Sequence, residues 1–144
     1  MKKKINSKIK KVYEPTINEK FMNPKQLEYF KKLLLDWKSD LLRESSSTIE
    51  HLKEESSNKP DNADRASIES ERSLELRARD RARKLISKIN KALRKIEDGT
   101  YGYCEETNEP ISIERLKARP IATLSIEAQE THEKFEKIYK EKEY

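Results

Sequence analysis

A long helix is indicated by the segment PDNADRASIESERSLELRARDRARKLISKINKALRKIED, residues 60–98. After Pro60 this segment contains no proline and no glycine, and Gly99 follows its last residue. Small and apolar residues recur in it at alternating intervals of four and three, at Ala78, Ala82, Leu85, Ile89, Ala92 and Ile96. Because one narrow apolar stripe cannot stabilise so long a helix in isolation, the pattern predicts a second helix packed against it.

The second helix is predicted immediately upstream, over residues 24–57. The same intervals recur there at Leu27, Phe30, Leu34, Trp37 and Leu41, and then fade through Thr48 and Leu52. Asn23 followed by Pro24 is typical of a helix start. Only residues 58–60 separate the two helices, so they must pack antiparallel. The predicted fold is mainly α, with a long antiparallel coiled-coil hairpin over residues 24–98 whose tip lies at 58–64 and is its least stable part.

A small globular knuckle over residues 99–124 and a C-terminal helix over residues 125–144 are predicted after the hairpin. Residues 101–104 and 111–113 resemble short strands, residues 114–118 fit one helical turn, and Ser125 is placed to cap the final helix. The expected core of this end is Tyr103, Ile111, Ile113, Leu116, Ile121, Leu124 and Ile126. Near the N-terminus, we expect Val12-Tyr13, Ile17 and Phe21-Met22 to dock beside the base of the hairpin.

The composition favours a coiled coil over a compact globule, because 41% of the residues are charged and 33% are hydrophobic. No run of about 20 apolar residues is present to span a bilayer, and the N-terminus lacks the apolar centre of a signal peptide. One cysteine excludes an intrachain disulfide and fits a reducing cytoplasm. The net charge of +5 lies within residues 1–23, since basic and acidic residues are equal in number from residue 24 onward. This basic N-terminal tail either contacts an acidic partner or is a poorly ordered, solubilising end.

Two acidic residues, Asp61 and Asp64, lie three positions apart at the predicted tip. They suit the N-cap and the acidic capping-box position of the long helix, where negative charge also interacts favourably with the helix dipole. A second hypothesis is that the hairpin presents both carboxylates to a partner at its far end. The two roles are compatible.

A run of basic residues follows on one face of the same helix, at Arg77, Arg81, Lys84 and Lys88, with Arg79 and Arg83 beside it. Asp80 is the only acidic residue between Leu76 and Asn90. One interpretation is pairing across the hairpin with Glu44, Glu50, Glu54 and Glu55. The other is a docking face for an acidic protein surface or a phosphate ligand, and the sequence leaves both open.

Four segments together resemble the DksA/TraR family of bacterial RNA polymerase-binding transcription factors. They are DNADRAS at 61–67, SLELRARDR at 73–81, YGYC at 101–104 and RLKARP at 115–120. The resemblance extends from about Phe21 to the C-terminus, and it implies a coiled-coil hairpin attached to a zinc-finger-like globular end. It also implies that the hairpin enters the secondary channel of RNA polymerase, where Arg77 and Arg81 dock and the tip residues Asp61, Asp64, Arg65 and Ala66 lie near the active site.

The function implied by this resemblance is regulation of transcription by a cytoplasmic, monomeric protein that is not an enzyme. The implied partner is RNA polymerase itself. The resemblance implies no binding to a membrane or to a specific DNA sequence. Promoter complexes such as those of ribosomal RNA genes are destabilised and others are assisted, in concert with the alarmone ppGpp. The resemblance places the ppGpp site at Leu85, Lys88, Arg119, Gln129 and Glu133. Gln129 stands where well-studied members have lysine, which should weaken the binding of phosphate.

The sequence departs from the zinc-binding members at their four cysteine positions. The corresponding residues, with the same spacing, are Cys104, Thr107, Ser125 and Ala128. A structural zinc site needs four good ligands, usually thiolates or imidazoles. We therefore expect no zinc and no other metal, and a knuckle held by apolar contacts.

Two other functions share features with this sequence. A transcript-cleavage factor also carries an acidic tip on a coiled coil, but the Gly-Tyr-Cys knuckle argues against that class. A self-associating coiled-coil scaffold would not depend on Asp61 or Asp64. The sequence contains no nucleophile–base pair and no glycine-rich phosphate loop, which argues against an enzyme.

Overall fold

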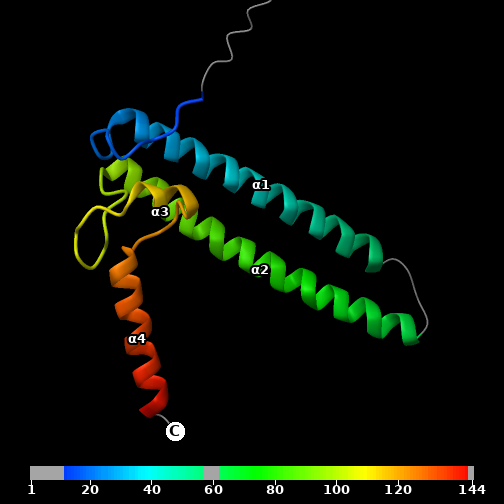
Figure 1. Ribbon diagram of the computed structural model, residues 1–144. Coiled ribbons are helices and arrows are strands. Elements are labelled where there is room, and N and C mark those ends of the chain that lie inside the picture. Colours follow the sequence, from blue (N-terminus) through cyan, green and yellow to red (C-terminus); the bar gives the residue numbers. More distant parts are fainter. Residues whose placement is uncertain (1–11, 57–61, 143–144) are drawn as a thin grey trace, which may run out of the picture.

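The computed structural model describes residues 12–56 and 62–142, apart from the side chains of residues 48–49, 51–56 and 62–64. Within these ranges lie four helices: α1 (Pro24–Ser56), α2 (Asn62–Asp98), α3 (Ile113–Ala118) and α4 (Ile126–Lys142). α1 and α2 pack antiparallel along each other (Figure 1). α3 and the adjoining turns lie at the base of this hairpin, the end that carries residues 24 and 98, and α4 points away from it. The predicted helical hairpin with a small globular end is confirmed.

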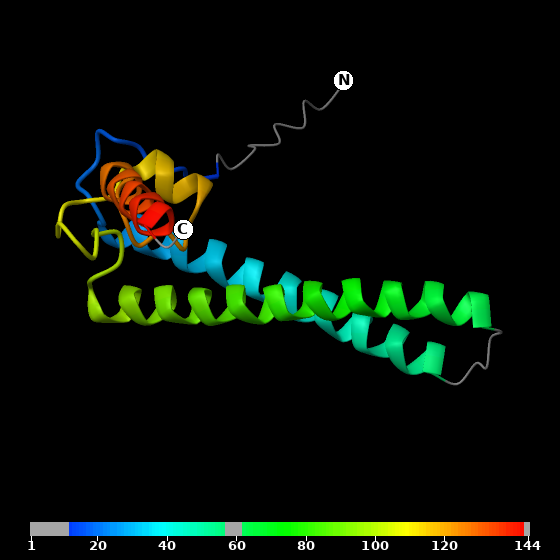
Figure 2. The ribbon, with the colours of Figure 1, turned by 90° about the horizontal axis from the view of Figure 1, so that it is seen from below.

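The apolar core of the hairpin is concentrated in the half nearer the base. The buried seam residues are Phe30, Leu34 and Leu41 from α1 and Ala82, Ile89 and Ala92 from α2. Seen from below, the two helices cross along their length (Figure 2). Burial therefore follows the predicted heptad positions where both helices supply apolar side chains.

The seam prediction was wrong at Ala78, which is exposed. The half-buried positions of α2 nearer the tip are instead Ile68, Arg72 and Glu75, again at intervals of four and three. Glu75 lies one heptad upstream of Ala82, so the seam continues there with polar side chains. Apolar burial consequently declines toward the tip.

Local capping interactions fix three of the helix ends. At the start of α1 the Asn23 side-chain oxygen accepts a hydrogen bond from the Gln26 amide at 2.9 Å. At the start of α4 the Ser125 hydroxyl oxygen accepts one from the Ala128 amide at 3.2 Å, as predicted. At the end of α2, Gly99 adopts a φ of 77°, the left-handed conformation that favours glycine after a helix.

The globular end contains no strand among the described residues, which contradicts the predicted pair of strands. A single bridge links Tyr103 and Pro110, supported by a hydrogen bond of 2.7 Å from the Ile111 amide to the Gly102 carbonyl. Gly102 has a φ of 88°, so residues 101–104 bend and do not form an extended strand. The predicted helical turn is present as α3, which begins after its N-cap Ser112.

The core of the globular end was predicted in part. Ile111, Ile113, Leu116 and Ile121 are buried and Leu124 is half-buried, as expected. Tyr103 and Ile126 were expected to be buried but are 37% and 48% exposed. The expected core did not include Tyr101 and Ala128, which are buried. Tyr101 takes the inner position because the bend at Gly102 turns the two tyrosine rings in different directions.

Residues 12–23, termed the N-terminal strap, close over the base of the hairpin. The Phe21 ring meets the Tyr103 ring edge-on, with their centroids 5.3 Å apart. The Met22 amide donates a hydrogen bond of 2.8 Å to the Gln26 side chain, which is fully buried. The expected docking of Phe21 and Met22 is therefore confirmed, whereas Val12 and Ile17, also expected to dock, are exposed.

In the part of the chain that the structure describes, no helix has the length and apolar character needed to cross a bilayer.

Candidate functional site

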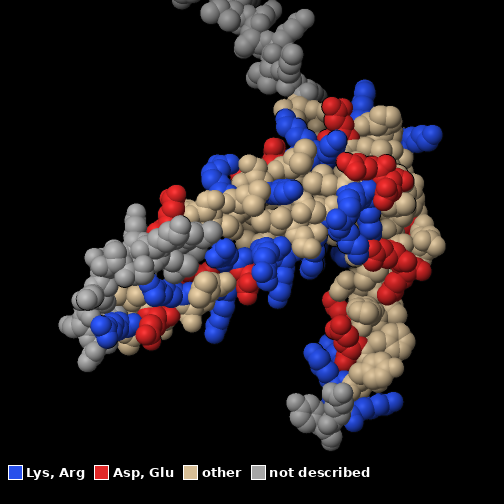
Figure 3. All heavy atoms as spheres, turned by 180° about the vertical axis from the view of Figure 1, so that it is seen from behind, with Lys and Arg blue, Asp and Glu red and all other residues tan. Residues whose placement is uncertain are grey.

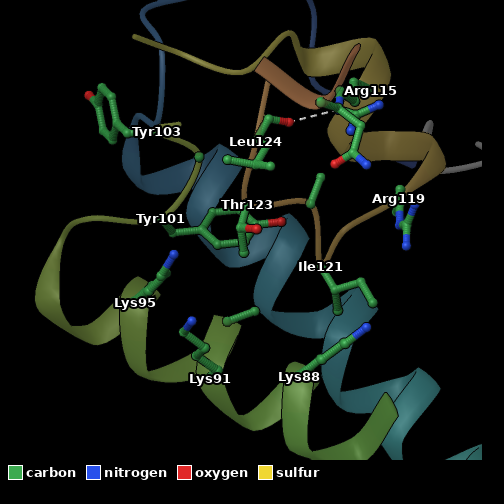
Figure 4. A pocket seen from close by; sticks show the side chains of 14 residues that line it. Lys88, Lys91, Lys95, Tyr101, Tyr103, Arg115, Arg119, Ile121, Thr123 and Leu124 are labelled. Carbon is green, nitrogen blue, oxygen red and sulfur yellow. Dashed lines mark hydrogen bonds between the residues drawn. The ribbon is translucent and has the colours of Figure 1, made fainter. Parts of the chain in front are cut away.

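A cationic cavity lies where α2 meets the globular end. Its volume is about 340 Å³, within the range of a small-molecule site. Lys88, Lys91 and Lys95 rise from one face of α2 on one side, and Arg115 and Arg119 lie on the other (Figure 4). No acidic residue is among the described residues that line it. Converging cations without a lining carboxylate favour an anionic ligand, above all one that carries phosphate.

Apolar and neutral groups complete the wall of this cavity. They include Ala92, Tyr101, Ile121, Ala122, Thr123 and Leu124. The Tyr101 hydroxyl donates a hydrogen bond of 2.7 Å to the Pro120 carbonyl, and burial raises the pKa of this phenol. The Arg115 side chain is positioned by a hydrogen bond of 3.0 Å from its Nε to the Leu124 carbonyl. A ligand with both an apolar ring and phosphates would find a matching surface for each part.

One carboxylate stands beside two of the cavity lysines. Glu105 Oε1 lies 2.5 Å from Lys95 Nζ and 3.3 Å from Lys91 Nζ. The hydrogen bond from Lys95 is the main reason that the pKa of Glu105 lies below its ordinary value. Glu105 is therefore a carboxylate at neutral pH and offsets part of the positive charge at this side of the cavity.

Three of the five residues expected at the ppGpp site, Lys88, Arg119 and Gln129, line this cavity. Leu85 and Glu133 do not line it: Leu85 packs against the hairpin core, and the Glu133 carboxylate accepts a hydrogen bond of 3.1 Å from Gln129. The sequence prediction missed Lys91, Lys95 and Arg115, which line the same cavity. The signal for the two lysines was present, since the basic face of the long helix continues past Lys88 at intervals of three and four.

The four positions that correspond to zinc ligands in the family lack a zinc-binding donor set. Burial raises the pKa of the Cys104 thiol, but hydrogen bonds from the Thr107 side chain and from the backbone amides of Ser125, Thr107 and Glu106 lower it to about 6. The Ser125 hydroxyl oxygen already accepts a hydrogen bond from the Ala128 amide. The methyl side chain of Ala128 has no atom that could bind a metal. Among the described residues, no three His, Cys, Asp or Glu side chains form a group that could hold a metal. One thiolate and two hydroxyls do not fit a structural zinc site.

The first turn of α2 lies at the end of that helix away from the globular end (Figure 1). Asp61 lies outside the described residues, so its predicted capping role stays a prediction. Asp64 is in the first turn of α2, although its side chain is outside the description, and Arg65 and Ala66 are exposed. The backbone therefore places Asp64 at the far end of the hairpin, as the sequence indicated.

The basic face of α2 is exposed to solvent. Lysine and arginine side chains gather along one edge of the hairpin and at its junction with the globular end (Figure 3). Arg77 and Arg81 are both exposed, and among the described residues neither pairs with an acid of α1. Arg83 lies 3.6 Å from Asp80 of the same helix. Arg77 and Arg81 are therefore accessible to a partner, and their docking stays a prediction, since the side chains of Glu54 and Glu55 lie outside the description.

Comparison with known proteins places both parts of the chain in one group. Residues 26–96 match the family described as DnaK suppressor protein DksA, N-terminal domain. Residues 99–134 match the prokaryotic dksA/traR C4-type zinc finger. Two curated relatives are named RNA polymerase-binding transcription factor DksA. The protein of Caulobacter vibrioides is 60% identical over 129 residues, 90% of this chain and 91% of its own. That of Escherichia coli K12 is 48% identical over 115 residues, 80% of this chain and 76% of its own.

A solved structure has the same architecture. Transcription factor DksA2 from Pseudomonas aeruginosa superimposes with a TM-score of 0.75 at 40% sequence identity, over 81% of this chain and 90% of that chain. The two sequence matches and this structure agree on the hairpin and on the globular end together.

Proposed function

Because the chain belongs to the DksA family, we propose that it is a transcription regulator that binds RNA polymerase directly. The observation that carries this proposal is the 60% identity to an RNA polymerase-binding transcription factor, over nine-tenths of both chains. The proposed regulator acts as a monomer in the cytoplasm, binds no specific DNA sequence and catalyses no reaction of its own.

The hairpin is proposed to act as a probe that enters the secondary channel of the polymerase. α2 has 37 residues, which corresponds to a length of about 55 Å at about 1.5 Å per residue. Such a rod would hold the first turn of α2, with Asp64, Arg65 and Ala66, far from the globular end, and the proposal places the carboxylates of Asp61 and Asp64 there. Near the polymerase active site, these charges would alter the stability of the promoter complex.

The basic face and the cationic cavity are proposed to serve binding. Arg77 and Arg81 are exposed and available to carboxylates on the polymerase. The cavity at the base is proposed to receive ppGpp, with Lys88 and Arg119 contacting phosphate and Gln129 contributing no charge. We therefore expect the response to ppGpp to be weaker than in relatives with a lysine at the position of Gln129.

Transcription in vitro from a ribosomal RNA promoter with the cognate polymerase tests this proposal. Asp64→Asn should abolish the inhibition while binding to polymerase is largely retained, because the change removes one tip charge and leaves the docking face intact. Asp98→Asn is the matched control, since this exposed acid lies at the other end of the same helix, away from the tip and from Arg77 and Arg81. Full inhibition by Asp64→Asn, or no association of the wild type with polymerase, would contradict the proposal.

The role of ppGpp is tested separately in the same assay. Inhibition by the wild type should increase when ppGpp is added, and Arg119→Ala should remove that increase without abolishing the basal effect. Equal inhibition with and without ppGpp would refute the co-effector role and would leave the proposed binding to polymerase standing.

A further inference from the structure

We propose that the Glu105 carboxylate is an internal counter-ion of the cationic cavity, and that it gives up Lys91 when a diphosphate group binds. The inference rests on the proposed anion-binding role of the cavity and adds how that binding is regulated. The ligand class is an anion with two linked phosphates, either free pyrophosphate or the diphosphate of a nucleotide.

The two lysines differ in how firmly Glu105 holds them. Lys95 Nζ lies 2.5 Å from the carboxylate and its side chain is 20% exposed, whereas Lys91 Nζ lies 3.3 Å away and its side chain is 55% exposed. A mobile, solvated ammonium exchanges partners more readily than an enclosed one. Lys91 is therefore the member of the pair that can turn to a ligand, and Lys95 stays with Glu105.

The position of Glu105 suits a competitor more than a ligand contact. It lies outside the lining of the cationic cavity and belongs to a neighbouring hollow shared with Lys95, Thr100 and Asn108. Its backbone amide donates a hydrogen bond of 2.9 Å to the carbonyl of Thr123, a residue of the cavity wall. The backbone bond anchors residue 105, and the pairing with Lys95 holds its carboxylate beside the cavity, where it lowers the positive potential that an incoming phosphate meets.

The charges of the cavity indicate why a diphosphate is the favoured anion. Glu105 pairs with Lys95, and among the described residues Lys88 and Arg119 have no acidic partner. Lys91 lines the cavity too, but it shares its charge with Glu105 until a ligand competes for it. Arg115 adds a planar guanidinium whose Nε is already held by Leu124, which leaves its terminal nitrogens for an anion. Two linked phosphates span more of a cavity of about 340 Å³ than a single phosphate does, and can contact the cations on both of its sides.

The test is an NMR titration of the full chain, without polymerase, with inorganic pyrophosphate, inorganic phosphate and GDP. Glu105→Gln should tighten binding of pyrophosphate and GDP by about two- to fivefold, the effect of removing one exposed competing ion pair. Glu106→Gln is the matched control, because it makes the same change one residue later, at a carboxylate that faces His132. Glu105→Asp, which retracts the charge by one methylene group, should give a smaller gain in the same direction.

Lys91→Ala separates competition from a merely structural role of Glu105. In that background the gain from Glu105→Gln should largely disappear, because the lysine that changes partner is gone. Weaker binding by Glu105→Gln, a gain equal to that of Glu106→Gln, or tighter binding of phosphate than of pyrophosphate would overturn the proposal. Absence of binding by every variant would also overturn it, whereas an effect of Asp64→Asn on transcription would still support the proposed function.

Discussion

Replacing Gly102 by alanine should loosen the N-terminal strap, because this glycine lies directly under it. A Cβ at residue 102 would lie 2.8 Å from the terminal methyl carbon of Met22 and 3.1 Å from the Phe21 ring. Gly102 also has a φ of 88°, which side-chain-bearing residues rarely adopt. Gly99 offers a matched control, since it has a φ of 77° and a Cβ there would meet nothing within 4 Å.

The expected magnitude has a backbone part and a packing part. The left-handed conformation should cost about 1–2 kcal/mol of unfolding free energy in either variant. Overpacking adds about 1–3 kcal/mol at Gly102 only, and the lower end applies because the flexible Met22 side chain can move. Gly102→Ala should therefore lose about 1 kcal/mol more than Gly99→Ala.

Urea denaturation followed by helical circular dichroism measures the two free energies of unfolding. Hydrogen exchange then localises the difference: the Met22 amide, which donates to Gln26, should lose protection in Gly102→Ala and keep it in Gly99→Ala. Equal destabilisation of the two variants, with equal protection at Met22, would refute the argument that the strap is seated on Gly102.

Three further perturbations test the packing and the titrating groups. Phe30→Ala should cost about 3–5 kcal/mol in urea denaturation, because the ring is completely buried, whereas Leu35→Ala at a 45% exposed position should cost less than about 1 kcal/mol. Burial raises the pKa of Cys104, but hydrogen bonds lower it to about 6. The ultraviolet absorbance of its thiolate should therefore titrate near that value, and the free energy of unfolding should rise as the pH increases from there toward the ordinary thiol pKa. A titration midpoint in the ordinary thiol range would contradict this. The hydrogen bond from Tyr13 lowers the pKa of Glu19. The contribution of the Glu19 carboxylate to the free energy of unfolding is therefore present above the ordinary carboxylate range and is lost as the pH falls through the lowered pKa. Acid should therefore lower the protection factors of the strap amides, each taken relative to the intrinsic exchange rate at the same pH, in the wild type but not in Glu19→Gln.

The hairpin could be predicted from sequence because its information is local and repeated. The helices were expected over residues 24–57 and 60–98, and the structure gives Pro24–Ser56 and Asn62–Asp98. Two apolar stripes and a short connection leave little freedom in how such helices pack. The error at Ala78 arose because this small residue fits the alternating intervals, whereas the structure exposes it and half-buries Glu75, a polar residue that a search for apolar positions cannot detect.

The globular end was harder to predict because its contacts are not local. Tyr101 and Tyr103 would share one face of a strand, yet the bend at Gly102 sends Tyr101 into the core and Tyr103 toward Phe21. The cationic cavity was also only partly foreseen, through the family resemblance. Arg115 and Lys91 line the same cavity because α3 packs near the base of α2. No local sequence pattern predicts that contact between distant segments.

The route of the strap over the globular end has a consequence for the order in which the molecule assembles. α1 and α2 are neighbours in the sequence, so their pairing needs only a short loop to close, and such contacts form early. Phe21 and Met22, by contrast, meet Tyr103 and Gly102, which the ribosome makes only after the whole hairpin. The strap must therefore wait for the segment that follows the hairpin, and its docking comes after the two long helices have paired.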